Sequence, residues 1–258
     1  MTTRSLRSAI CIIGVGLAAA AMHPARASNS QSPFGVEFSD CVESIGVGLA
    51  PTPNVVALTP PGFIPVGLGT PVSPIVVRTA DCAGIAVDGH KAKPGSIVQI
   101  GAVIVPPEIG VGDINNYTFW YYTTSEKLAR RLQDLGVAAQ HVANIDYALH
   151  PGQAGTTNTL SVTVKRPGSP RFVLSGTVVP TETPAGSFEA IWWQQTAAGN
   201  VRMDTSVPVI AIGSANLGLV TDADGDLGQL IGSGALAFPV LQQFNILPNA
   251  HMGVAIAH

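Results

Sequence analysis

Arg78 is the residue whose position most directly suggests chemistry. It lies inside the apolar segment Ile75–Thr79, which is typical of a β-strand. A buried guanidinium without a partner costs several kcal/mol, so an inward-facing Arg78 needs a carboxylate. The candidate partners are Glu43, Asp81, Glu108 and Glu189. Such a pair in an apolar cavity would hold the carboxylate or carbonyl group of a small ligand; the alternative is an outward-facing arginine on an edge strand.

Aromatic side chains give a second indication of a ligand site. Strict alternation along 117–123 places Trp120 and Tyr122 on one face, and Tyr117, Phe119 and Tyr121 on the other. Trp192 and Trp193 are adjacent in a strand candidate, 188–194, so they point to opposite faces and one of them must leave the core or line a cavity. We therefore take Trp120, Tyr122 and Trp193 as ligand-binding candidates, together with Arg78, Glu108 and Glu189. The alternative is that these rings only fill a β core.

Other kinds of site find less support. The histidines show no metal-binding spacing, there is no Gly-x-Ser-x-Gly motif, and no Gly-rich phosphate loop suggests a nucleotide cofactor. We thus predict neither a metal nor a cofactor. The segment Asp222–Asp226 resembles half of a calcium-binding loop, but Leu227 and Ser233 stand where glycine and glutamate are required. An acidic surface turn and a weak calcium site both remain open.

The first residues predict export. Arg4 and Arg7 precede the apolar run 9–22, and Ala25-Arg26-Ala27 has the form of a cleavage site. The run is shorter than the roughly 20 residues that span a bilayer, and no later run is a membrane span. We predict a signal peptide over 1–27 and one β-rich domain over 28–258, exported to the periplasm or outside the cell.

Charge and cysteine content fit that compartment. The signal peptide removes three of 13 basic residues and none of 16 acidic ones, so the mature chain has 10 against 16, a net charge of −6. This balance argues against a nucleic-acid partner. Cys11 leaves with the signal, and the remaining pair, Cys41 and Cys82, predicts a disulfide. Two buried thiols are the alternative.

The elements that must position these residues are mostly strands. A helix over 124–135 is predicted by the capping pair Thr123 and Glu126, three leucines at helical spacing and the terminating Gly136. Proline confines Val55–Leu58 to a sheet edge or a strand end, and 217–257 is undecided between strand and helix. The remaining segments predict a mainly β, antiparallel barrel- or sandwich-like sheet with this one main helix. The strand segments are 75–79, 84–87, 97–105, 117–123, 140–148, 159–165, 172–179, 188–194 and 207–212.

The order of several segments resembles the first half of the acetoacetate-decarboxylase-like superfamily. These segments are Pro60-Pro61-Gly62-Phe63-Ile64-Pro65, Ile75-Val76-Val77, the strand ending at Val105, and Asn116-Tyr117-Thr118-Phe119-Trp120-Tyr121-Tyr122, within 51–148. The resemblance implies a barrel-like fold around an apolar cavity, in which Arg78 would match an arginine that holds the substrate carboxylate. The decarboxylase also has two adjacent lysines, one of which forms a Schiff base, and this chain has no such pair. Lys127 is closest in position, but we predict it on the exposed side of the helix.

Three functions follow from these observations. The first is an exported protein that binds a small organic acid or carbonyl compound, with or without lyase activity on a keto-acid. The second is a non-catalytic structural or interaction protein of the envelope, which would show an exposed apolar patch instead of a cavity. The third is a hydrolase with dispersed catalytic residues. The sequence leaves the ligand and the oligomeric state open.

Overall fold

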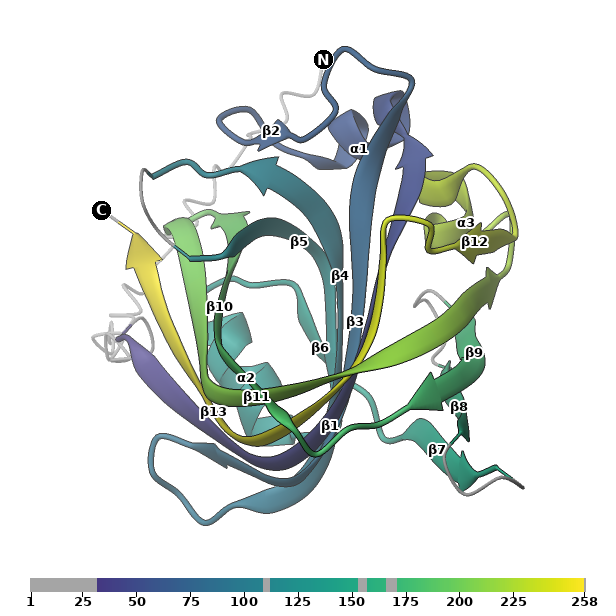
Figure 1. Ribbon diagram of the computed structural model, residues 1–258. Helices are drawn as coiled ribbons and strands as arrows, with labels where there is room; N and C mark the ends of the chain where they lie inside the picture. Colours follow the sequence, from purple (N-terminus) through teal and green to yellow (C-terminus); the bar gives the residue numbers. More distant parts are fainter. Residues whose placement is uncertain (1–31, 109–111, 153–156, 166–170, 258) are drawn as a thin grey trace, which may run out of the picture.

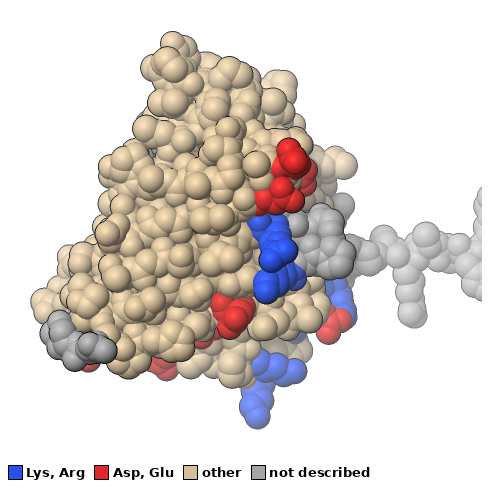
Figure 2. Space-filling model, turned by 90° about the vertical axis from the view of Figure 1, so that its right-hand side faces the viewer, with Lys and Arg blue, Asp and Glu red and all other residues tan. Residues whose placement is uncertain are grey.

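The structure, a computed structural model, describes residues 32–108, 112–152, 157–165 and 171–257. The predicted signal peptide lies outside the described residues. Thirteen strands form one large, mostly antiparallel sheet, and three short helices accompany it. The mainly β fold is therefore confirmed. Charged side chains are few on the face that Figure 2 shows, where they gather toward one edge.

Seven strands close into a ring. Hydrogen-bonded pairing runs β10-β5-β4-β3-β1-β13-β11, and β11 pairs again with β10, so the path returns to its start. Each of these pairs is antiparallel except β5 with β10. Figure 1 shows the strands curving around a common centre. Their bounds are β1 Phe34–Pro51, β3 Val72–Val87, β4 Lys93–Val105, β5 Ile114–Thr123, β10 Pro184–Thr196, β11 Gly199–Thr221 and β13 Leu241–Ala257.

The second half of β11 leaves the ring and carries a further set of strands. It pairs with β9 (Phe172–Val179), which continues through β8 (Asn158–Val164) to β7 (Ile145–Pro151). The short strands β2 (Ile64–Pro65), β6 (Ala139–His141) and β12 (Ala235–Ala237) pair with β4, β5 and β11. Two apolar clusters result. One, which we call the ring cluster, includes Val36, Val76 and Trp192; the other, the outer cluster, includes Leu160, Leu174 and Trp193.

The main helix is confirmed. α2 spans Glu126–Asp134, and the Leu128 N–H donates to the Ser125 hydroxyl at 3.3 Å. The N-cap is therefore Ser125 and not the predicted Thr123, whose hydroxyl accepts from the Ser125 N–H at 3.0 Å. Leu128, Leu132 and Leu135 are buried in the ring cluster. Gly136 follows with φ +83°, the left-handed conformation that ends helices.

The predicted faces of the aromatic strand need correction, because β5 contains a bulge. Thr118 pairs with Gly101 and Trp120 with Ile100, which leaves Phe119 as an extra residue. Alternation therefore shifts by one at Phe119. As a result Tyr117, Phe119 and Tyr122 all belong to the outer cluster. Tyr121 belongs to the ring cluster.

A bend shifts the alternation of three neighbouring strands at one level. Alternate residues of each strand face into the ring, and at this level the inward set switches between even-numbered and odd-numbered residues. The switch falls between Phe38 and Cys41 in β1, between Cys82 and Ile85 in β3, and between Leu247 and Ala250 in β13. The β1–β13 register has no inserted residue there. Instead Asp40 adopts φ +48°, which an aspartate tolerates better than most residues. Without this change Glu43 would point out of the ring rather than into it.

Two other local predictions also differ from the structure. The segment Val55–Leu58 was predicted as an edge strand, but it belongs to helix α1, Thr52–Leu58. Its proline lies in the first turn, where the missing N–H has no helical partner to lose, so the helix tolerates it. The predicted strand 140–148 is split between β6 and β7, and the undecided segment 217–257 holds the end of β11, α3 (Asp226–Ile231), β12 and β13.

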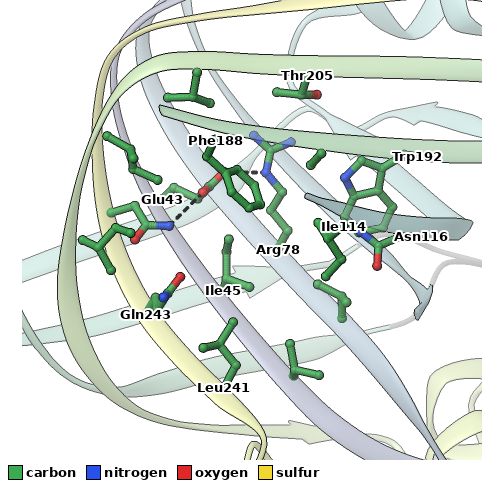
Figure 3. Close-up of a pocket in the computed structure, with 17 residues that line it drawn as sticks. Glu43, Ile45, Arg78, Ile114, Asn116, Phe188, Trp192, Thr205, Leu241 and Gln243 are labelled. Atoms are coloured by element: carbon green, nitrogen blue, oxygen red, sulfur yellow. Dashed lines mark hydrogen bonds and ion pairs between the residues drawn. The ribbon is translucent and has the colours of Figure 1, made fainter. Parts of the chain in front are cut away.

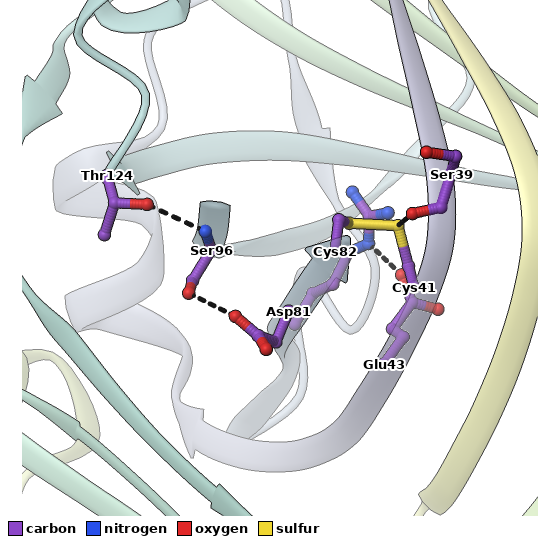
Figure 4. The surroundings of a disulfide bond; sticks show 8 residues. Ser39, Cys41, Glu43, Asp81, Cys82, Ser96 and Thr124 are labelled. Carbon is purple, nitrogen blue, oxygen red and sulfur yellow. Dashed lines mark hydrogen bonds and ion pairs between the residues drawn. A yellow bond between two sulfur atoms is a disulfide. The ribbon is translucent and has the colours of Figure 1, made fainter. Parts of the chain in front are cut away.

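The predicted disulfide is confirmed. Cys41 and Cys82 are direct partners in the β1–β3 pairing, with Cα atoms 4.0 Å apart, and both are buried. Figure 4 shows the bridge between the two strands, close to Glu43. Among the described helices, none has the length and apolar character needed to cross a membrane.

Removing the disulfide should lower stability strongly. It closes a loop with a sequence separation of 41, for which the chain-entropy model gives about 4 kcal/mol. We expect the Cys41→Ala/Cys82→Ala variant to lose about that free energy of unfolding in urea titrations. The wild type in excess dithiothreitol is the matched comparison and should behave alike. A loss below about 1 kcal/mol in both would contradict the assigned role.

Candidate functional site

A pocket of about 180 Å³ lies among the inward-facing side chains of six ring strands, β1, β3, β5, β10, β11 and β13 (Figure 3). Most of its walls are apolar: Ile45, Val47, Val76, Ile114, Phe188, Ala190, Trp192, Val207, Ile210, Ile212 and Leu241. Six polar side chains interrupt them: Glu43, Arg78, Asn116, Thr205, Gln243 and Asn245. Ile212 and Leu241 are partly exposed, whereas Arg78 and Glu43 are buried. The pocket therefore combines apolar walls with a buried polar end.

A buried ion pair forms that polar end. Arg78 Nε donates to Glu43 Oε2, and the two residues are 7% and 4% exposed. The other carboxylate oxygen, Glu43 Oε1, accepts from Asn245 Nδ2 at 3.1 Å. Register explains the contacts, because Glu43 lies directly opposite Asn245 and Arg78 lies one inward position along from Glu43 on the neighbouring strand. Both carboxylate oxygens are thus occupied, and the pair carries no net charge.

The guanidinium of Arg78 has N–H donors that its pairing with Glu43 does not use. Among the described residues, its hydrogen bonding uses Nε, and neither Nη nitrogen has a protein acceptor. Figure 3 shows the side chain extending from β3 toward Thr205 of β11. Arginine presents five N–H donors in a planar fork, so the two Nη groups can donate to an oxygen placed in the pocket.

Tyr121 is a second polar group beside the pair. Its side chain is fully buried in the ring cluster, and its hydroxyl has no hydrogen-bond partner among the described residues. Burial raises the pKa of the phenol far above its usual value, an effect that the nearby Arg78 charge opposes. The phenol therefore stays protonated and neutral over the range in which the fold is expected to be stable.

Comparison with known proteins addresses the fold. No protein-family model matches the chain, and no curated protein matches it in sequence. Solved structures do match in shape. A structure from studies of acetoacetate decarboxylase superposes with a TM-score of 0.56 at 9% identity, covering 86% of this chain and 87% of that one. An acetoacetate decarboxylase-like enzyme from Sphingomonas wittichii RW1 also reaches 0.56, at 12% identity, over 88% and 92%.

A third match is the enduracididine biosynthesis enzyme MppR complexed with pyruvate, with a TM-score of 0.52, 13% identity and coverage of 86% and 88%. This chain has the acetoacetate-decarboxylase-like fold. The resemblance seen in residues 51–148 therefore extends over nearly the whole described chain. At these identities the likeness establishes the architecture and leaves the chemistry to the residues of the site.

The lysines lie elsewhere in this version of the acetoacetate-decarboxylase-like fold. None of the residues that line the ring pocket is a lysine. Lys91, Lys93 and Lys127 line a separate hollow near the start of α2, together with His90 and His141. Lys127 is half-buried there rather than fully exposed as predicted. The fourth lysine, Lys165, follows β8 and is exposed.

The six predicted ligand-binding residues are not gathered together. Arg78 lines the ring pocket, and its partner is Glu43, one of the four carboxylates considered. Trp120 and Tyr122 contact the outer cluster. Glu108 forms an ion pair with Arg202 at 2.8 Å in a partly exposed position, and Glu189 is exposed.

The two adjacent tryptophans do face opposite sides, as predicted. Trp193 lies in the outer cluster, where its Nε1 donates to Asn115 Oδ1 at 3.0 Å. Trp192 lies in the ring cluster and lines the pocket. The sequence predicted that one of them would line a cavity and took Trp193 as the ligand-binding candidate, whereas Trp192 is the one that lines the pocket.

Three polar pocket residues had no recognisable signal in the sequence. Asn116 and Thr205 lie in short polar runs, beside Asn115 and between Asp204 and Ser206, and Asn245 is a single polar residue between Phe244 and Ile246. Their inward direction depends on the parity of each strand, which a bulge or a bend can reverse. The bend explains the inward direction of Asn245, whereas Thr205 continues the inward alternation of Val201 and Met203 in β11.

The acidic segment 222–226 is a turn before α3. Asp222 Oδ1 accepts from the Asp224 N–H at 3.1 Å, which is a local turn contact. Within the described ranges, no group of three or more His, Cys, Asp or Glu side chains is arranged to hold a metal ion.

Removing one partner of the buried ion pair should lower the stability more than removing both partners together. Glu43→Leu leaves the Arg78 charge buried and unpaired, so we expect a loss of about 3–5 kcal/mol in the free energy of unfolding. Adding Arg78→Met should recover much of that loss, because the unpaired charge is then gone. Urea unfolding of the wild type, the singles and the double variant measures the coupling.

The partly exposed pair between Glu108 and Arg202 is the matched control. Glu108→Gln should cost about 1 kcal/mol or less, because water screens that pair. A Glu43→Leu variant that is no less stable than Glu108→Gln would show that the inward pair does not exist in solution.

Proposed function

We propose that this protein binds a small carbonyl compound or carboxylic acid in the ring pocket, with the Nη groups of Arg78 donating to its oxygen. The observation that carries the proposal is a buried, paired arginine whose outer nitrogens remain without a protein acceptor inside an apolar cavity. A group of this kind is expensive to bury, and burial is compensated when a ligand oxygen completes its hydrogen bonds.

The pocket walls suit such a ligand. Apolar side chains around the polar end would remove the carbon skeleton from water and strengthen the hydrogen bonds to Arg78 by lowering the local dielectric. Glu43 already neutralises the guanidinium, so a neutral carbonyl oxygen is accommodated without leaving net charge in the cavity. MppR, whose fold is similar, has a structure in complex with pyruvate, which supports a ligand of this size and class.

The proposal is for binding rather than for decarboxylation through an imine. A Schiff-base reaction on a carbonyl substrate needs an amine nucleophile at the reacting carbon. The lining residues offer a guanidinium, a carboxylate, amides and a hydroxyl, none of which can form that imine. A lyase on this fold would need different chemistry.

Binding can be tested with five-carbon probes. We expect 2-oxopentanoate, pentanoate or 2-pentanone to bind the wild type in isothermal titration calorimetry, and Arg78→Lys to weaken that binding at least about tenfold. Lysine keeps the charge and can pair with Glu43, but its donors lie on a single nitrogen, and it lacks the two Nη groups of the planar guanidinium. Glu108→Gln, at a distance from the pocket, serves as the control and should bind as the wild type does.

Borohydride reduction with 2-oxopentanoate should leave the wild-type mass unchanged, since no imine forms. A covalent adduct on lysine would contradict the non-covalent mode. Equal affinities of wild type and Arg78→Lys would contradict the role of the arginine.

An exposed apolar groove favours a second candidate, the envelope interaction protein. Its lining includes Val56, Leu58 and Leu68, each of them exposed, together with Phe63 and Tyr117. The sparse charge seen in Figure 2 agrees with a surface adapted to protein contacts. Absence of binding by every five-carbon probe would favour this candidate over the ligand-binding one.

Export is a separate part of the proposal. The Cys41–Cys82 disulfide supports an oxidising compartment. We expect mass spectrometry of the mature protein, recovered from the periplasm or the medium of a bacterial host, to show Ser28 as its first residue. Retention of residues 1–27 on a cytoplasmic protein would contradict export.

A further inference from the structure

Three buried polar atoms in the ring pocket have no hydrogen-bond partner among the described residues. They are Asn116 Oδ1, Thr205 Oγ1 and Asn245 Oδ1, and their residues are 1%, 4% and 0% exposed. All three residues line the same cavity as Arg78. We propose that the ligand carries a hydroxyl group in addition to the oxygen that Arg78 holds, so that the pocket selects hydroxylated acids or carbonyl compounds. The inference rests on the proposed function.

The orientation of Asn245 follows from its neighbour. Its Nδ2 donates to Glu43 Oε1 at 3.1 Å, and a flipped amide would set Oδ1 against a carboxylate oxygen. Oδ1 is therefore the free end, and it is an acceptor. An acceptor buried in an apolar cavity is stabilised by an O–H or N–H donor of the ligand, because leaving the acceptor unpaired is unfavourable.

Thr205 offers a hydroxyl to the same space. Its strand partners are Ala190 in β10 and Met252 in β13, neither of which has a polar side chain for it to bond. Figure 3 shows Thr205 across the cavity from Glu43, on the side toward which Arg78 extends. A ligand hydroxyl can both donate to and accept from the threonine, so it matches this position better than an aliphatic carbon.

Asn116 occupies a third wall. It pairs with Trp192 in the parallel β5–β10 contact, and Figure 3 shows the two side chains next to each other. The three polar atoms without a hydrogen-bond partner thus come from β5, β11 and β13, whereas Arg78 comes from β3. This distribution surrounds a ligand with one charged donor and several partners for its hydroxyl.

The same groups argue against an amino group as the ligand's donor. An ammonium ion needs a carboxylate when it is buried. Both oxygens of Glu43 already accept hydrogen bonds, from Arg78 and from Asn245. A neutral hydroxyl has no such requirement.

The size of the cavity limits the ligand. A dry cavity of about 150 Å³ holds benzene, and this pocket measures about 180 Å³. Five-carbon hydroxy acids have eight non-hydrogen atoms and are of that size. Because the position of the hydroxyl along the chain is open, the probes should include each isomer.

The test compares pentanoate with 2-, 3-, 4- and 5-hydroxypentanoate by isothermal titration calorimetry on the full mature chain. We expect at least one hydroxy isomer to bind about tenfold or more tightly than pentanoate, which corresponds to one good hydrogen bond. Thr205→Val keeps the shape of the side chain and breaks no hydrogen bond within the described protein. It should reduce the preference for the hydroxylated acid toward unity, and its affinity for pentanoate is measured in the same titrations.

Ser206→Ala is the matched control, because Ser206 is exposed on the opposite face of the same strand. It should keep the wild-type preference. Unfolding curves of both variants check that they fold. Asn116→Leu gives a second, independent variant with the same expected loss of preference.

The outcomes separate the two proposals. If pentanoate binds as tightly as every hydroxy isomer, water satisfies the three polar groups and the hydroxyl selection is overturned, while the ligand pocket stands. If none of the five-carbon probes binds, 2-pentanone included, the proposed function itself fails. A preference that survives in both Thr205→Val and Asn116→Leu would also overturn the inference.

Discussion

The ion pair between Arg78 and Glu43 is the constraint on which the rest of the structure depends. Two opposite charges are buried among apolar side chains, and each would be strongly unfavourable without the other. The pair bridges β1 and β3, and Asn245 ties it to β13. Three neighbouring strands must therefore keep their register for the charges to meet. The disulfide between β1 and β3 joins the same two strands a short distance along.

The inward direction of these groups is a property of the sheet rather than of any one residue. The bend at Asp40 changes the parity of β1, β3 and β13 at one level. Along β1, Phe38 points inward before the bend and Glu43 points inward after it. The bulge at Phe119 changes the parity of β5 in the same way. The bend decides that Glu43, Arg78 and Asn245 all face the cavity.

Features governed by local signals could be predicted from the sequence. The leucine spacing of α2, the cysteine pair and the strand-rich pattern all depend on residues close in the chain or on compartment chemistry, although the N-cap is Ser125 rather than the predicted Thr123. The choice of Trp192 over Trp193, and the inward positions of Thr205 and Asn245, depend on curvature and long-range pairing. The helix α1 was missed because Pro53 reads as a strand-edge signal, although a first helical turn tolerates it equally well.

Sharing a fold leaves open what the site does. This chain has the acetoacetate-decarboxylase-like fold, yet its ring pocket is lined by an arginine–glutamate pair, amides and a threonine, without a lysine. The surrounding architecture supplies an apolar enclosure, and the residues on its inner wall decide the chemistry. Here they are suited to hold an oxygen-bearing molecule by hydrogen bonds.

The most direct measurement is a crystal structure of the mature protein grown with the tightest-binding five-carbon acid. The account predicts ordered ligand density inside the ring, with an oxygen within hydrogen-bonding distance of the Nη groups of Arg78 while Nε remains bound to Glu43. An interior closed by side chains, with the arginine turned to solvent and the acid elsewhere or absent, would contradict it.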